Sequence, residues 1–286
     1  MGLAEMDGPQ AASLPGGRMH FQHGPIDLIL KAEGPDAAQA FQAAWQRFRT
    51  VLEELVAELP ALRSEADPAH RFTRPVARRM RAAVIPHLPV FITPMAAVAG
   101  SVADEVLAAM LAGNSLSKAW VNNGGDIAFH LADGETADAA LLSGLPAHIR
   151  VGSADPVRGM ATSGWRGRSH SLGIADSVTV LAENAAMADA AATLIANAID
   201  LPGHAAISRA PAESLSPDSD LGERMVTLGV GKLDARETAH ALDRGHAFAE
   251  TRIASGLAIA AILVLNGQSR ICGSPALLQD GVLTHA

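Results

Sequence analysis

The apolar residues between positions 37 and 62 recur at steps of three and four, the spacing of one face of an α-helix. The recurring positions are Phe41, Trp45, Phe48, Leu52, Leu55 and Val56. Pro60 marks the expected end of this helix, because proline lacks the amide hydrogen that a helix interior needs. A strand pattern at residues 26–30 comes directly before it. The pattern predicts a long amphipathic helix that must bury its apolar face in a larger fold.

Strand-like and helix-like segments alternate along the rest of the chain. Strands are predicted at 90–92, 120–122, 127–131, 148–152, 177–181 and 257–265, and helices at 96–111, 187–199 and 237–253. Residues 204–224 carry two prolines with several serines and aspartates, which predicts a long loop. Because neighbouring strands look partly joined as hairpins, we expect an α+β fold with antiparallel sheets packed against helices, not a doubly wound parallel sheet.

The two ends of the chain bear on domain organisation and localisation. Residues 1–18 are rich in Gly, Pro and Ala and predict a flexible arm, followed by a single α+β domain over 19–286. The arm lacks a basic segment followed by an apolar one, so no secretory signal is expected. The most apolar stretch, 257–265, is too short to span a bilayer, so no membrane association is expected. One cysteine, Cys272, excludes an intrachain disulfide and fits a cytoplasmic location.

The composition limits the partners that the chain can take. Its 286 residues are 49% hydrophobic and 18% charged, the balance of a globular protein. The net charge of −8 argues against nucleic-acid binding, which needs a cationic surface to displace counterions from phosphate. The chain has no tyrosine, so only its three Trp, seven Phe and its histidines can stack on a base or a flavin.

A glycine turn at residues 122–126 is the first candidate site. A predicted strand enters it, and its residues after Asn122 are Asn123, Gly124, Gly125 and Asp126. Glycine lets a phosphate or a ring approach the main chain closely. An ordinary hairpin turn explains the same residues, because Asn-Gly and Gly-Gly are common turn dipeptides.

The segment 159–170 combines small hydroxyl residues, glycine, two arginines and a histidine. Thr162, Ser163 and Gly164 can offer hydroxyl and amide donors to a pyrophosphate, with arginine as the counter-charge. His170 can act as an acid or a base near neutral pH. A polar connector has the same composition, so the segment alone leaves both interpretations open.

Asp189 and Thr193 lie four residues apart on a predicted helix and therefore point to the same face. The residues between them are all alanine, so a ligand could approach the helix closely. A carboxylate with a hydroxyl one turn away is suited to Mg²⁺. The simpler interpretation is a pair of solvent-facing or capping side chains.

Four segments occur in the order of a known family pattern, and together they resemble the ApbE-like superfamily, most closely its shorter cytoplasmic branch. The segments are 94–100, 121–127, 161–164 with 169–170, and 177–180 with 188–193. The resemblance covers roughly residues 20 to 200, and the order of the segments is more specific than any one motif.

The resemblance implies a T-fold-like architecture and a flavin-nucleotide site. That site would comprise Asn123, Gly124, Gly125, Asp126, Thr162, Ser163 and Gly164. The family's Mg²⁺ ligands match Asp189 and Thr193, with a backbone carbonyl near Val98 as a third. The implied activity is cleavage of FAD and transfer of FMN to a target protein, with Mg²⁺ neutralising the pyrophosphate.

Some positions differ from the family pattern and keep two alternatives open. Ala99 stands where the family has lysine, and residues 171–174 replace a segment that carries a carboxylate after the histidine. A non-catalytic nucleotide- or metabolite-binding module is therefore one alternative, and a role for Cys272 in sulfur metabolism is another. A homodimer is a further hypothesis, made by analogy with the fold alone.

Overall fold

The centre of the molecule is a nine-stranded antiparallel sheet. The structure, a computed structural model, describes residues 8–140, 147–274 and 278–280. The strand order is β1-β2-β3-β4-β5-β8-β9-β12-β13, and each neighbouring pair is antiparallel. These strands are β1 (Gln10–Leu14), β2 (Arg18–His23), β3 (Ile26–Glu33), β4 (Lys118–Asn123), β5 (Asp126–Leu131), β8 (Gly159–Ser163), β9 (Ser177–Ala182), β12 (Ala260–Leu265) and β13 (Gln268–Gly273).

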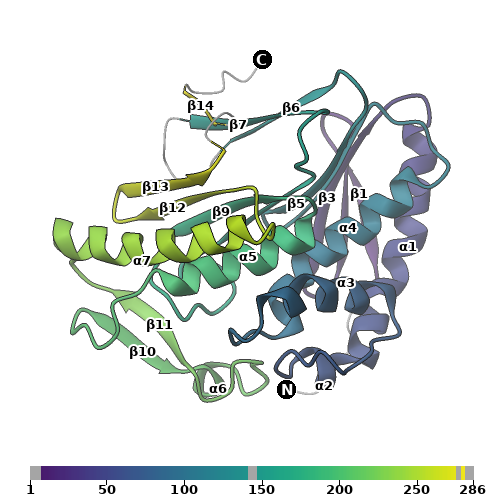
Figure 1. The fold of residues 1–286 in the computed structure, drawn as a ribbon. Coiled ribbons are helices and arrows are strands. Elements are labelled where there is room, and N and C mark those ends of the chain that lie inside the picture. Colours follow the sequence, from purple (N-terminus) through teal and green to yellow (C-terminus); the bar gives the residue numbers. More distant parts are fainter. Residues whose placement is uncertain (1–7, 141–146, 275–277, 281–286) are drawn as a thin grey trace.

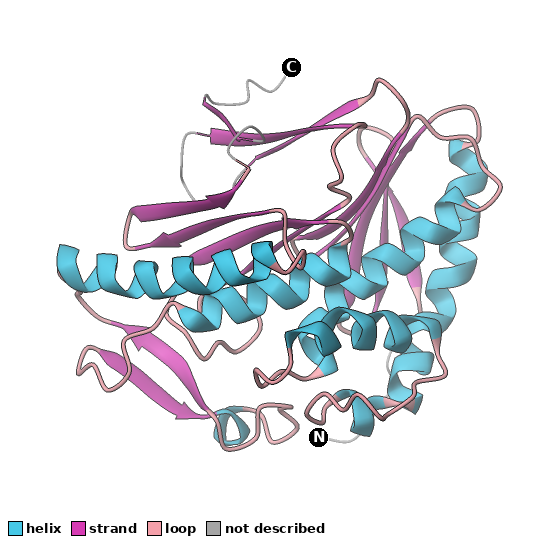
Figure 2. Cartoon of the chain, in the orientation of Figure 1, coloured by secondary structure: helices cyan, strands magenta, loops and turns pink. Residues whose placement is uncertain are grey.

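Helices cover one face of this sheet, and a small three-stranded sheet lies over the other (Figure 1). The helices are α1 (Ala37–Ala57), α2 (Leu59–Leu62), α3 (Pro75–Val84), η1 (Ile85–His87), η2 (Pro94–Ala97), α4 (Val98–Leu111), α5 (Ala185–Ala198), α6 (Ala212–Leu215) and α7 (Ala235–Ala254). The small sheet has the order β14-β7-β6, from Leu278–Asp280, Ala147–Gly152 and Thr136–Ala140. Figure 2 shows a separate hairpin, β10 (Ile207–Pro211) with β11 (Met225–Val230), on the helical side.

The large sheet consists of two halves with the same connectivity. In the first half, β2 and β3 lead through α1 and α4 to the β4–β5 hairpin; in the second, β8 and β9 lead through α5 and α7 to the β12–β13 hairpin. Each half has its own apolar core, one around Phe48 and Met110 and one around Ile195 and Leu242. The halves meet where β5 pairs with β8, and only two residue pairs form this ladder. This confirms the α+β, T-fold-like class that the sequence predicted.

Most of the predicted elements are confirmed, and the differences have physical causes. The long helix is α1, and Pro60 lies in the first turn of the short α2, where its missing N–H costs nothing. Residues 90–92 are not a strand, and the predicted loop over 204–224 contains β10 and α6. Gln10–Leu14, expected in the arm, forms β1 by pairing with β2. The boundary between an arm and a single domain stays a prediction.

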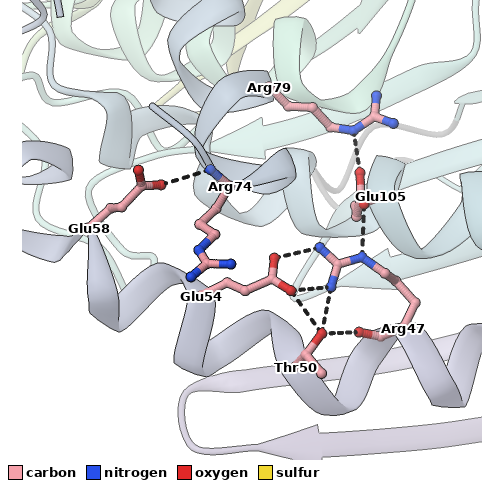
Figure 3. A network of polar contacts seen from close by, with 7 residues as sticks. All are labelled: Arg47, Thr50, Glu54, Glu58, Arg74, Arg79 and Glu105. Carbon is pink, nitrogen blue, oxygen red and sulfur yellow. Dashed lines mark hydrogen bonds and ion pairs between the residues drawn. The ribbon is translucent and has the colours of Figure 1, made fainter. Parts of the chain in front are cut away.

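Ion pairs and hydrogen bonds join helices α1, α3 and α4 on the helical side of the sheet. Glu105 on α4 accepts hydrogen bonds of 2.8 Å from Arg47 on α1 and from Arg79 on α3 (Figure 3). Arg47 also pairs with Glu54. The Glu58 carboxylate accepts hydrogen bonds from the backbone nitrogen atoms that precede α3, at Thr73 and Arg74. These contacts hold α1, α3 and α4 together on one side of the sheet.

Within the described residues, one stretch is long and apolar enough to cross a membrane by length and composition. It is Pro94–Leu111, which comprises η2 and α4. Half of it is buried inside the fold. Since α4 packs against α1, α5, β4 and β5, its apolar residues are those of a core helix.

Candidate functional site

A pocket of about 380 Å³ opens where the two halves meet. The first half contributes η2, the start of α4 and the start of β5, and the second contributes the end of β8 and one side of α5. The lining includes Phe91, Thr93, Val98, Ala99, Asp126, Ser163, Arg168, Ser169, His170, Leu172, Asp189, Thr193, Asn197, Ser216, Ser219 and Asp220. The pocket thus brings together six of the eleven predicted site residues: Val98, Asp126, Ser163, His170, Asp189 and Thr193.

Helices α4 and α5 cap each other in a mutual exchange: each provides an aspartate that accepts hydrogen bonds from backbone nitrogens at the N-terminal end of the other. Asp189 on α5 accepts a hydrogen bond of 3.0 Å from the Gly100 backbone nitrogen in the first turn of α4. Asp104 on α4 accepts hydrogen bonds of 3.1 and 2.9 Å from the backbone nitrogens of Ala185 and Ala186 at the start of α5. The first N–H groups of a helix lack partners within it, and a carboxylate also complements the helix dipole there. This exchange sets how the two helices cross beside the pocket.

Two glycines let the start of α5 fit between a helix and a strand. A Cβ on Gly100 would lie 2.2 Å from the carbonyl oxygen of Ala185, and a Cβ on Gly159 would lie 2.0 Å from the carbonyl carbon of Asn184. Real Cβ atoms do not approach backbone that closely. Asn184 then caps α5, with its side-chain oxygen accepting a hydrogen bond of 2.8 Å from the Met187 nitrogen. The α5 side chains that face the pocket are therefore positioned by backbone contact.

Asp126 is a buried carboxylate at the join between β5 and β8. It is 9% exposed, and its Oδ1 accepts a hydrogen bond of 3.2 Å from the Thr162 backbone nitrogen. Burial raises the pKa of Asp126 to about 7, although the Thr162 amide and the positive charge of Arg168 act in the opposite direction. A cation or a charged ligand that entered the pocket would therefore change the protonation state of Asp126.

Asp189 is the second carboxylate of the pocket. Burial raises its pKa well above the usual value, and the nearby charge of Asp126 raises it further. Two desolvated carboxylates that repel each other gain stability from a shared cation. The Thr193 hydroxyl lies one helical turn from Asp189 and has no hydrogen-bond partner within the described chain. Carboxylate, hydroxyl and backbone carbonyl oxygens form a donor set that fits Mg²⁺.

The positively charged guanidinium of Arg168 lies against the glycine turn of residues 122–126. Gly124 and Gly125 both have positive φ, at 67° and 115°, which explains why glycine occupies them. A Cβ on Gly124 would lie 2.2 Å from Nη2 of Arg168, so the guanidinium rests on this turn at the pocket wall. The Asn123 side chain donates a hydrogen bond of 3.1 Å to the carbonyl oxygen of Ala99 and so ties the turn to α4.

Besides Gly124, four predicted site residues are absent from the pocket lining. The Thr162 side chain is on the opposite face of the sheet, where its hydroxyl lies 2.9 Å from that of Thr179. Gly125 lines a different cavity, on that same face. Gly164 makes room for backbone, because a Cβ there would lie 2.4 Å from the Asp176 carbonyl oxygen. Asn123 is buried in its contact with α4, so its role is to hold the pocket wall.

The sequence named both arginines of segment 159–170 as counter-charges, and the structure separates them. Arg168 lines the pocket, whereas Arg166 pairs with Asp176 at 3.2 Å and lies over the Trp165 ring. His170 also lines the pocket, with an exposed side chain. Arg168 and His170 are therefore the basic residues of this segment that could meet a charged ligand.

Several pocket residues were missed because they lie in segments assigned to a strand or a loop. Phe91 lines the pocket and carries the Arg224 guanidinium 3.3 Å from its ring centroid. Asp220 lines it too and accepts a hydrogen bond from the buried Thr93 hydroxyl. The acidic and serine-rich composition of residues 214–220 was the only signal for this wall.

Fold and pocket together define an α+β protein of two similar halves, with an acidic, oxygen-rich site between them. The chain belongs to the family described as AbpE bacteria, whose model matches residues 11–271. The chain is thus a member of the ApbE-like group that its motifs indicated.

The relatives of the chain include proteins of several archaea. It is similar to the UPF0280 protein of Methanopyrus kandleri, with 33% identity over 60% of this chain and 69% of that protein. It is also similar to the UPF0280 protein of Archaeoglobus fulgidus, with 30% identity over 74% of this chain and 88% of that protein. Among solved structures, the apo form of Pseudomonas stutzeri flavinyl transferase ApbE matches with a TM-score of 0.41 and 15% identity, covering 97% and 98% of the two chains.

Proposed function

We propose that the chain binds FAD or a related flavin or pyrophosphate compound together with Mg²⁺, and that it transfers FMN from FAD to a protein. The observation that carries this proposal is the pair of desolvated carboxylates, Asp126 and Asp189, in a pocket whose wall also carries Arg168. A cation between the carboxylates and a phosphate near the arginine would neutralise each other. Family membership supports a flavin compound as the ligand.

Each pocket residue has a role in this proposal. Asp189 and Thr193 hold the cation, with a backbone carbonyl near Val98, and Asp126 adds a negative charge beside them. When bound, Mg²⁺ supplies charge neutralisation for the pyrophosphate. Arg168 and the Ser163 hydroxyl bind phosphate oxygens, and His170 moves a proton at the pocket mouth. Phe91 offers the aromatic surface that a missing tyrosine cannot provide.

The turnover experiment follows FAD in the presence of Mg²⁺ by chromatography. Release of AMP with FMN attached to an acceptor protein supports the transferase, whereas AMP with free FMN shows hydrolysis of FAD by water. Arg168→Gln is expected to weaken FAD binding at least tenfold, because a charge-assisted contact to phosphate is lost. Arg166→Gln is the matched control, since that arginine pairs with Asp176 outside the pocket. Equal affinities for the two variants would contradict the proposed phosphate position.

The non-catalytic alternative predicts a different result in the same experiment. Calorimetry would then show Mg²⁺-dependent FAD binding while no AMP forms. The exposed side chain of His170 motivates this alternative, because a general acid or base must lie within hydrogen-bond reach of the atom it serves. AMP release by the wild type that disappears in His170→Gln would exclude the non-catalytic alternative.

A sulfur-metabolism role for Cys272 receives no support from the geometry. The side chain is 1% exposed and does not line the pocket. Burial, with the nearby Glu250, raises the pKa of its thiol to about 12, so the reactive thiolate is scarce at neutral pH. A cytoplasmic location and a homodimer remain part of the proposal, and fractionation and light scattering test them.

A further inference from the structure

A second group of metal-ligating side chains lies away from the pocket, between α7 and the last strand of the large sheet. His246 and Glu250 stand one turn apart on α7, with Nε2 and Oε1 separated by 3.9 Å. Cys272 on β13 points toward them, and the three ligand atoms all lie within 4.8 Å of one another. None of the three lines the pocket between the halves.

We propose that His246, Glu250 and Cys272 form a site for a thiophilic divalent cation such as Zn²⁺. Sulfur, imidazole nitrogen and carboxylate oxygen are the three ligand types that Zn²⁺ takes from proteins. Thiolate sulfur disfavours Mg²⁺, which prefers oxygen ligands, so this site and the pocket select different cations. The four-residue spacing of His246 and Glu250 places both on one helical face.

The burial of the three residues defines a site that is closed on one side and open on the other. Cys272 is 1% exposed, whereas the side chains of His246 and Glu250 are 39% and 50% exposed. The cation would enter from solvent past the helix and reach the thiol at the bottom. Three protein ligands leave a fourth tetrahedral position for water.

Cation binding would replace an existing contact with a stronger one. Without a cation, the Cys272 thiol keeps its proton and donates a hydrogen bond to the Glu250 carboxylate. On binding, the S–H bond breaks, the proton leaves to solvent, and a sulfur–metal bond forms with no change in oxidation state. The cation would then connect α7 to β13 through coordination bonds in place of that hydrogen bond.

Cobalt(II) is a suitable probe, because thiolate coordination gives it a charge-transfer absorption that oxygen or nitrogen ligands do not. Tag-free protein is titrated with Co²⁺, and then with Zn²⁺ as a competitor. The expected result is one equivalent of Co²⁺ with the thiolate band, displaced by Zn²⁺, and a higher melting temperature with Zn²⁺. Binding without the thiolate band, or no binding at micromolar Co²⁺, would overturn the proposal.

Variants separate this site from other surface histidines. Cys272→Ser should abolish the band, and His246→Gln and Glu250→Gln should each weaken Co²⁺ binding at least tenfold. The matched control is His240→Gln, because His240 is an exposed residue of the same helix outside the cluster. A fall in affinity for His240→Gln equal to that for His246→Gln would also overturn the proposal. Because the side chains of His246 and Glu250 are partly exposed, their variants are expected to fold, and they test the site even where the serine variant does not fold.

Discussion

The backbone nitrogen of Gly100 lies 3.0 Å from the Asp189 carboxylate and donates a hydrogen bond to it across the crossing of α4 and α5. This contact can serve as a helix cap, as a way of holding a metal ligand, or as both. Asp104 offers a comparison within the same molecule, because it caps the start of α5 without lining the pocket. The two aspartates therefore separate a structural role from a binding role.

Asp189→Asn should weaken Mg²⁺ binding at least tenfold. The amide oxygen can still accept the hydrogen bond from Gly100, but the negative charge that attracts the cation is gone. Asp104→Asn is the control: it should cost about 1 kcal/mol of stability through a lost hydrogen bond and leave Mg²⁺ affinity within about twofold. Isothermal titration calorimetry measures both affinities. If both variants lost Mg²⁺ equally, Asp189 would be a cap and not a ligand.

Asp126→Asn should change how stability depends on pH. The pKa of Asp126 is raised from 3.8 to about 7 in the folded chain, so the folded state holds a proton that the unfolded state has released. Its contribution is complete below pH 4 and is lost as pH rises to about 7. With a chelator present to remove bound cations, the free energy of unfolding of the variant relative to the wild type should therefore rise by about 2–4 kcal/mol between pH 4 and pH 7. Urea unfolding at several pH values gives the difference, and a flat one would contradict the raised pKa.

His87→Leu should act in the opposite direction in the same pH range. His87 is 1% exposed, and within the described chain its Nδ1 has no hydrogen-bond partner. Burial, with the positive charge of Arg252, lowers its pKa to about 4. The unfolded chain then takes up a proton below pH 6.5 that the folded chain refuses, so wild-type stability falls as pH drops from 6.5 to 4. The leucine variant should lose this decline, worth up to about 3 kcal/mol. Thermal unfolding at pH 5 and pH 7.5 tests it, and an unchanged decline would count against the assignment.

Gly100→Ala should damage both stability and the cation site. The added Cβ would lie 2.2 Å from the Ala185 carbonyl oxygen, so the two helices must move apart. Overpacking of this kind costs about 1–3 kcal/mol, and the shift also moves Asp189. Gly8→Ala is the control, because a Cβ there meets nothing within 4 Å. Chemical denaturation and Mg²⁺ calorimetry measure the two effects, and a fully stable Gly100→Ala protein would refute the close helix contact.

The sequence predicted best the elements whose signal is local. Local patterns predicted α1, the β4–β5 hairpin and β9. An amphipathic face, a glycine turn and a β-branched strand are each determined by residues close together in the sequence. Asp189 and Thr193 were placed on one helical face for the same reason, and both line the pocket.

The rest depends on contacts between distant segments. The strand prediction at residues 90–92 followed β-branched and aromatic composition, but Ile92 packs into the apolar cluster beneath α3 and α5 without a strand partner. Helix α3 was not among the predicted helices; its Pro75 occupies the first turn, where the missing N–H costs nothing. The side of the sheet that Thr162 faces depends on register, and a shift of one residue reverses it. Asp220 reaches the pocket through the return of the chain after β10, which no local pattern encodes.

Because the ladder between β5 and β8 has only two residue pairs, a ligand in the pocket should strengthen the join between the two halves. Each half carries its own core, and the ligand-facing residues come from both sides of this short joint. A compound that binds residues of both halves therefore stabilises their association, and its binding free energy adds to the work needed to separate them. In a single-molecule pulling experiment, the rupture force at this joint would report occupancy of the pocket.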